Sequence, residues 1–142
     1  MLKRVILAIV VVFFAWVALS MLMHGVILGK SYDIPGLFRP MEEMMAWLSL
    51  AVCLVVAWAF VLVYARFVAP KSVGAGLGLG ALWGIAAGVS MGLGSYSAEP
   101  IPFSMAVVWC VGTFVQFTVA GLLTGLIVKP PKQVEGGQAA QA

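Results

Sequence analysis

Charged side chains are scarce in this sequence. Asp, Glu, Lys and Arg make up 9% of its 142 residues, whereas 63% of the residues are hydrophobic. A soluble domain has about 25% charged residues, and a chain this apolar cannot cover a folded surface with enough ionic groups to stay in water. The composition therefore excludes a soluble enzyme domain and predicts an integral membrane protein.

Long stretches contain no charged residue at all, namely 5–29, 44–65, 72–98 and 100–128. Each stretch has the roughly 20 residues that a helix needs to cross a bilayer. We therefore predict an all-α membrane protein with a single domain, 1–128, of four transmembrane helices at about 5–28, 44–65, 73–94 and 103–128. The polar, proline-broken segment 129–142 is predicted to be a disordered cytoplasmic tail.

The few basic residues are unevenly placed. Six of the eight lie before the first span, between the second and third, or after the fourth, and only Lys30 and Arg39 lie on the opposite side. Positively charged segments stay in the cytoplasm. We therefore expect a multi-pass protein of the bacterial inner membrane with both termini cytoplasmic. The net charge of +3 follows from this topology and does not indicate binding to nucleic acid.

Groups that carry chemistry are also few. The two cysteines, Cys53 and Cys110, lie in predicted spans and form no Cys-x-x-Cys pair, so the minimum motif for disulfide exchange is missing. His24 is the only histidine, which excludes a haem held by two histidines of this chain. No predicted span contains the carboxylate that a proton-coupled exporter needs. We expect no enzymatic activity and no intrinsic cofactor.

Glycine, in contrast, is concentrated in the third predicted span, which holds eight of the sixteen glycines. Glycine occupies every fourth position over much of this span. These positions form a strip without side chains, against which another helix can pack closely. Either the chain's own helices or another subunit could cover this strip. The residues of the strip are Gly76, Gly80, Gly84, Gly88 and Gly92.

The fourth span carries further signals of helix packing. Gln116 is the only amide near the middle of the membrane, and we expect it to bond to another helix. Gly121 and Gly125 form a second pair of small residues at helical spacing.

One pattern points to a ligand. Apart from Met1, all methionines map to the predicted outer ends of the helices, where His24 also lies. Thioether and imidazole groups suit Cu(I), so an outer-side copper site is one hypothesis, and a quinone or haem edge shared with partners is another. Packing is the competing interpretation for methionine. The candidate ligands are His24, Met21, Met23, Met41, Met44, Met45, Met91, Met105, Tyr32 and Tyr96.

Two local signals concern the outer side of the membrane. Glu42 and Glu43 follow Pro40 and are expected in the first turn of the second helix, where carboxylates meet the positive end of the helix dipole. A weak repeat relates the sequence from Leu28 to Tyr32 to that from Leu93 to Tyr96. It suggests two duplicated helical hairpins, although chance similarity within so restricted a composition stays open.

These observations favour packing over chemistry. We expect a non-enzymatic accessory or scaffolding subunit that packs through its glycine-rich helix into a homo-oligomer or a larger membrane complex. Its partners would be the lipid bilayer and other membrane subunits or further copies of itself. The alternative is an outer-side protein that binds copper, a quinone or a haem through the methionine and histidine cluster.

Overall fold

The computed structural model describes residues 1–129, apart from the side chain of Met41. Within this range the chain is helical between its turns and contains no strand. Four helices are long and apolar enough to cross a membrane, so the prediction of an all-helical chain with four such helices is confirmed. The predicted disorder of the tail concerns residues 130–142, which lie outside the described residues.

The long helices begin and end close to the borders of the charge-free stretches. They are α1 (Leu2–Ser20), α2 (Ala46–Phe67), α3 (Val73–Ala98) and α4 (Phe103–Ile127). Helix α1 continues directly into a π-helix, Met21–Ile27, so the first membrane-spanning helix runs over Leu2–Ile27. Two short 3₁₀ turns, Gly29–Tyr32 and Met41–Glu43, lie in the connection to α2.

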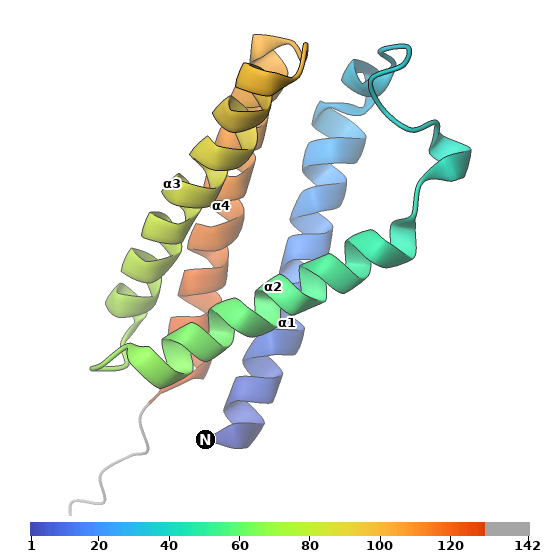
Figure 1. The fold of residues 1–142 in the computed structure, drawn as a ribbon. Helices are drawn as coiled ribbons and strands as arrows, with labels where there is room; N and C mark the ends of the chain where they lie inside the picture. Colours follow the sequence, from blue (N-terminus) through green and yellow to red (C-terminus); the bar gives the residue numbers. More distant parts are fainter. Residues whose placement is uncertain (130–142) are drawn as a thin grey trace, which may run out of the picture.

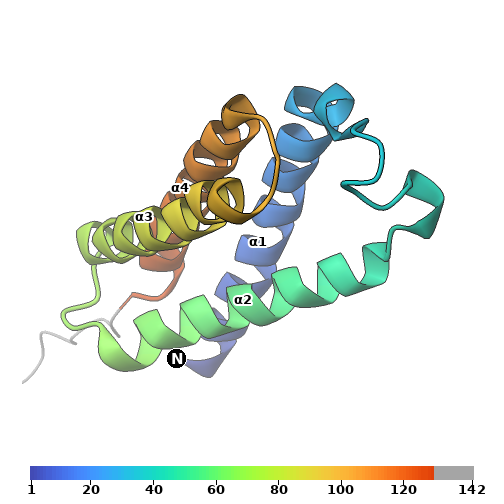
Figure 2. The ribbon, with the colours of Figure 1, turned by 45° about the horizontal axis from the view of Figure 1, so that its top comes forward.

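Three of the helices form a compact group, and the fourth crosses it. Helices α1 and α4 run side by side, and α3 lies along α4 for its whole length (Figure 1). Helix α2 crosses obliquely, close to the others at one end and away from them at the other (Figure 2). The terminal end of the bundle holds Met1, residues 68–72 and Lys129. The hairpin end holds the connections 28–45 and 99–102 (Figure 1).

The turn between α2 and α3 is fixed by hydrogen bonds. Ser72 caps α3, because its hydroxyl accepts from the main-chain N–H of Ala75 at 3.0 Å, and its carbonyl accepts from the Tyr64 hydroxyl at 2.9 Å. The Lys71 ammonium donates to the carbonyl of Val68 at 2.5 Å and lies 5.5 Å from the centre of the Tyr64 ring. These contacts attach the end of α2 to the start of α3.

An aromatic cluster holds the helices together where all four approach one another. It has one ring from each helix: Trp16, Phe60, Trp83 and Phe117, with neighbouring ring centres 4.9–6.3 Å apart. Edge-on and tilted pairs at this spacing are favourable contacts. The larger hydrophobic core extends from this cluster toward the terminal end through α1, α2 and α4. A smaller core at the hairpin end joins α4 to the connection 28–45 and takes no residue from α2.

The structure corrects the expected start of the second helix. Glu42 and Glu43 lie in the 3₁₀ turn Met41–Glu43, where the N–H of Glu43 donates to the carbonyl of Pro40, and α2 begins only at Ala46. The carboxylates therefore precede the helix and do not occupy its first turn. Pro40 thus begins a local turn and not the long helix, because its carbonyl accepts a hydrogen bond from the residue three positions later.

The two segments of the suggested repeat have different conformations. Gly29–Tyr32 is a 3₁₀ turn, whereas Leu93 and Tyr96 lie within α3. The Tyr96 ring packs edge-on against Phe103, with ring centres 5.4 Å apart. The duplication of a helical hairpin stays a prediction.

Candidate functional site

The glycine strip of α3 lies directly against the backbone of α4. All five of its glycines are buried. A Cβ atom added at Gly84 would lie 2.9 Å from the Cα and carbonyl oxygen of Phe114, and one at Gly88 would lie 2.6 Å from the carbonyl of Cys110. Such separations are too short for real Cβ atoms, so only glycine permits this approach.

The remaining glycines of this contact behave in the same way. A Cβ at Gly76 would overlap the carbonyl of Gly121, and a Cβ at Gly121 would overlap the carbonyl of Gly76. At Gly80 the obstructing atoms belong to the backbone of α4, and at Gly92 they are a carbonyl oxygen of α4 and the Cys110 sulfur. At Gly125 they belong to the start of α3. Helix α4 of the same chain therefore covers the strip.

Gln116, near the middle of α4, connects this helix to the last turn of α1. Its side-chain amide donates to the Ser20 hydroxyl at 2.8 Å and reaches the main-chain carbonyl of Trp16 at 3.5 Å. The indole N–H of Trp16 donates in return to the main-chain carbonyl of Gln116 at 2.6 Å. The Gln116 amide therefore contributes to the contact between α1 and α4.

The π-helix at the end of α1 sets the direction of the next polar residue. Its hydrogen bonds span five residues instead of four, as in the bond from the N–H of Leu28 to the carbonyl of Met23 at 3.0 Å. Met23 is buried and fills the space left by Gly112 of α4, where a Cβ would overlap its sulfur. One turn of π-helix thus directs Met23 toward α4 and His24 toward the connection that follows.

A cluster of three polar aromatic side chains lies at the hairpin end. The Tyr32 hydroxyl accepts from the indole N–H of Trp109 at 2.9 Å and shares a hydrogen bond with Nδ1 of His24. The indole can only donate, so the Tyr32 hydroxyl can donate its own proton to Nδ1 of His24 when that nitrogen is unprotonated. Burial raises the pKa of the Tyr32 phenol above its ordinary value of 10.0, and the bond from Trp109 lowers it in part. The cluster joins α1, the connection 28–45 and α4.

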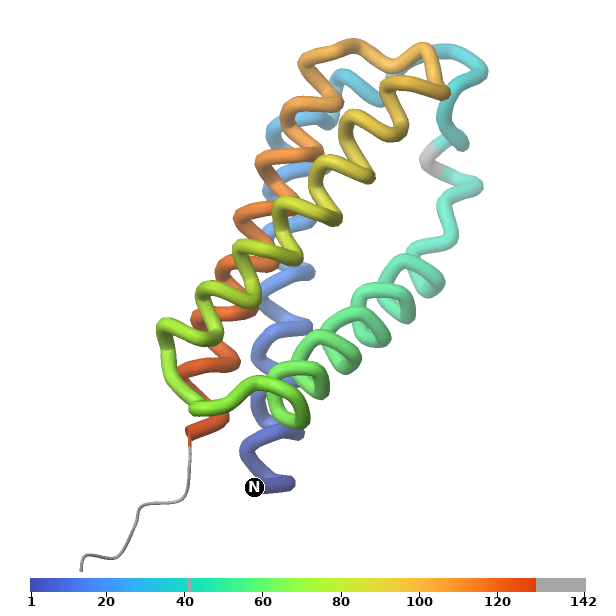
Figure 3. Tube along the Cα trace, turned by 60° about the vertical axis from the view of Figure 1, so that its left-hand side comes forward, coloured from blue at the N-terminus to red at the C-terminus, as the bar shows by residue number. Residues whose placement is uncertain are grey.

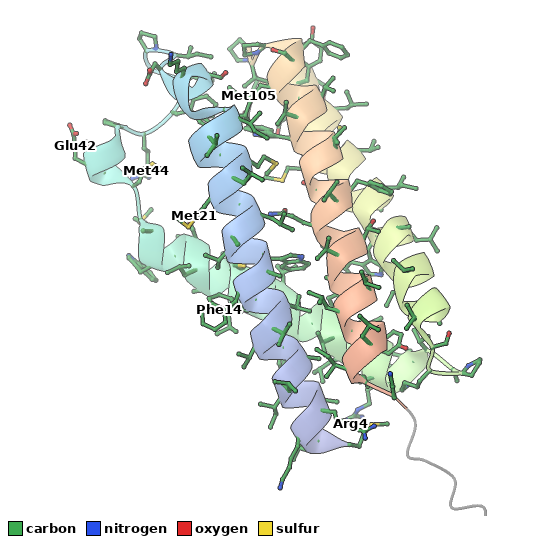
Figure 4. All side chains as sticks on the ribbon, turned by 180° about the vertical axis from the view of Figure 1, so that it is seen from behind. Arg4, Phe14, Met21, Glu42, Met44 and Met105 are labelled. Carbon is green, nitrogen blue, oxygen red and sulfur yellow. The ribbon has the colours of Figure 1, made fainter. Side chains whose placement is uncertain are left out.

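The methionines do not share one environment. Met105 is fully buried among Leu28, Ile101, Ala106 and Trp109, and it lies between α1 and α4 in Figure 4. The sulfur of Met91 accepts from the Thr113 hydroxyl at 3.8 Å.

The other candidate ligands at this end are exposed or lie in a turn. Met21, in the π-helix, and Met44, before α2, are both exposed (Figure 4). Met45, also before α2, is exposed as well, and Met41 lies in the 3₁₀ turn. Within residues 1–129, no group of three or more His, Cys, Asp or Glu side chains is placed to hold a metal ion. The copper hypothesis stays a prediction. In the structure, Nδ1 of the His24 imidazole is hydrogen-bonded to Tyr32.

Several contacts could not be identified from the sequence. The sequence does not indicate that Trp16 and Ser20 meet Gln116, or that Tyr32 meets Trp109. The aromatic cluster of four rings was also missed, because its members come from four separate helices and no periodicity relates them.

Comparisons of this chain with protein-family profiles, with curated protein sequences and with solved structures find no match.

Proposed function

We propose that this protein is a non-enzymatic accessory or scaffolding subunit of a larger membrane assembly. In this proposal it lies in a bacterial inner membrane with both termini in the cytoplasm, so the terminal end of the bundle faces inward and the hairpin end outward. The excess of Lys and Arg at the terminal end supports this orientation.

One observation carries the proposal. Polar side chains of two spans bond to each other's helix in the network of Gln116, Ser20 and Trp16, which fixes α1 against α4. The cluster of Tyr32, His24 and Trp109 is used in the same way at the hairpin end. In lipid, where apolar contact gains little over contact with acyl chains, such bonds and close glycine packing are the main sources of helix association. A chain built in this way is suited to present a fixed surface.

Extraction in a gentle detergent tests the proposal. The chain should migrate under native conditions in an assembly much larger than its own 15.0 kDa with bound detergent. Gly84→Leu should abolish the assembly, because it forces α3 away from α4, whereas Met44→Ala, at an exposed side chain, should leave it intact.

Two results would contradict the proposal. One is migration of the wild-type chain as a single copy in detergent. The other is a metal or an absorbing cofactor in stoichiometric amount that is lost on His24→Ala, since that result would favour a ligand-binding protein.

A further inference from the structure

The amino-terminal part of α2 has no cover within the described chain. Every residue from 46 to 52 is exposed, which amounts to about two turns in all directions, and burial begins only farther along the helix. We call residues 46–52 the α2 arm. Figure 3 shows it apart from α1, α3 and α4, whereas the other end of α2 lies against them. The arm is therefore attached to the bundle only through the rest of α2 and the connection 28–45.

Acyl chains suit the apolar side chains of this arm but not its hydroxyl group. Trp47 is 69% exposed and Leu50 is 47% exposed, and both are compatible with acyl chains. Ser49, in contrast, presents a hydroxyl on the same two turns. In a bilayer, a hydroxyl on a spanning helix bonds either to its own backbone, as Thr118 does, or to another helix, because acyl chains offer it no hydrogen bond.

The charge next to the arm indicates what kind of partner helix would fit it. Glu42 and Glu43 are both exposed just before the arm, and Figure 4 shows Glu42 directed away from the bundle. Arg39 is the only basic residue in the segment 39–45, which leaves it net negative.

This charge argues against a second copy of the chain in the same place. Two copies related by a twofold axis would bring like surfaces together, so the acidic segments of both would face each other. Like charges in close contact oppose association, whereas opposite charges guide it and fix its register. The complement of the arm is an apolar helix with a basic outer end.

We infer that the angle between the α2 arm and α3 receives one transmembrane helix of a different subunit, with Lys or Arg at its outer end beside Glu42 and Glu43. This inference rests on the proposed accessory function and names the surface through which it would act. The Ser49 hydroxyl would bond to the incoming helix, and Trp83 and the other rings of the aromatic cluster would limit how deeply that helix enters.

Photo-crosslinking in native membranes tests this inference. A photoreactive phenylalanine analogue at Leu50 should form a protein adduct that maps to a transmembrane helix with a basic outer end. The same analogue at Phe14, which is 63% exposed on α1, serves as the matched control and should label lipid. Glu43→Lys should reduce the adduct at position 50 roughly tenfold, whereas Glu99→Lys, on the α3–α4 connection, should leave it unchanged.

Four results would overturn the inference. They are an adduct between two copies of this chain, labelling of lipid alone at position 50, an adduct that persists in Glu43→Lys, and an adduct with a helix that lacks a basic outer end. The native migration assay separates this failure from that of the proposed function. A large assembly combined with lipid labelling alone at Leu50 would retain the accessory role and exclude the arm as its contact surface.

Discussion

Trp16 and Gln116 form a reciprocal pair, in which the side chain of each reaches the main-chain carbonyl of the other, at 2.6 Å from the indole and 3.5 Å from the amide. A pair of this kind fixes both the distance between α1 and α4 and their register along the helix axes. Because Gln116 also donates to Ser20, its amide is the centre of the contact between these helices.

Removing this amide should weaken the bundle. Gln116→Leu keeps the approximate side-chain volume but loses both hydrogen bonds of the amide, and we expect a loss of roughly 0.6–2 kcal/mol in the free energy of unfolding. Reversible unfolding in mixed micelles measures this change. Thr118→Val is the control, because the Thr118 hydroxyl is exposed and bonds only to Phe114 of its own helix. Equal stability of the two variants would contradict this role of Gln116.

The glycine contact predicts opposite effects for two glycines of α3. Gly84→Ala should destabilise the protein by roughly 1–3 kcal/mol, because the new methyl group would press against the backbone of Phe114. Gly78→Ala should be neutral or slightly stabilising, since a Cβ there meets open space and alanine favours the helix. The same unfolding assay compares them, and a comparable loss in both variants would show that α4 does not lie against the strip.

A substitution at Thr124 should stabilise the fold. Its hydroxyl is fully buried and has no hydrogen-bond partner within residues 1–129, so its presence carries a cost in free energy. Thr124→Val keeps the shape and should stabilise the fold by about 1 kcal/mol in the unfolding assay. A destabilised variant would mean that the hydroxyl has a hydrogen-bond partner inside the bundle.

The Tyr32 phenol gives the bundle a pH dependence at the alkaline side. Because the pKa of Tyr32 is raised in the folded chain, the unfolded chain loses this proton first. The stabilising contribution is fully present below the ordinary tyrosine value of 10.0 and is lost as the pH rises through the folded value. Tyr32→Phe should remove this part of the pH profile and weaken the attachment of the connection 28–45. Unfolding midpoints measured between neutral and alkaline pH compare the two chains, and identical profiles would contradict the assignment.

The orientation can be tested separately from the packing. A reporter fused after Lys132 should be cytoplasmic, because the terminal end carries most of the basic residues. Labelling of this reporter from the periplasm would reverse the proposed topology and place the α2 arm on the inner side.

The sequence predicted the number of long helices, because charge-free stretches of sufficient length have few alternatives in lipid. It did not predict what covers the glycine strip, since a periodic pattern defines a face but not the helix that packs on it. Likewise, it indicated that Gln116 bonds to another helix without identifying Ser20 as the partner. Glu42 and Glu43 were placed wrongly, because a proline followed by acids can start a 3₁₀ turn as readily as a long helix.

The π-helix at Met21–Ile27 has a consequence for how this chain tolerates changes in length. Its wider turn accommodates more residues per rotation than the α-helix before it, so deleting one residue there would let ordinary spacing resume. Side chains beyond the deletion would then keep about the same direction, because one rotation is completed with one residue fewer, whereas the imidazole and the thioether next to it, which lie within the turn, would exchange their present neighbours for others. The number of residues in this turn, more than their identity, decides which of them meet α4.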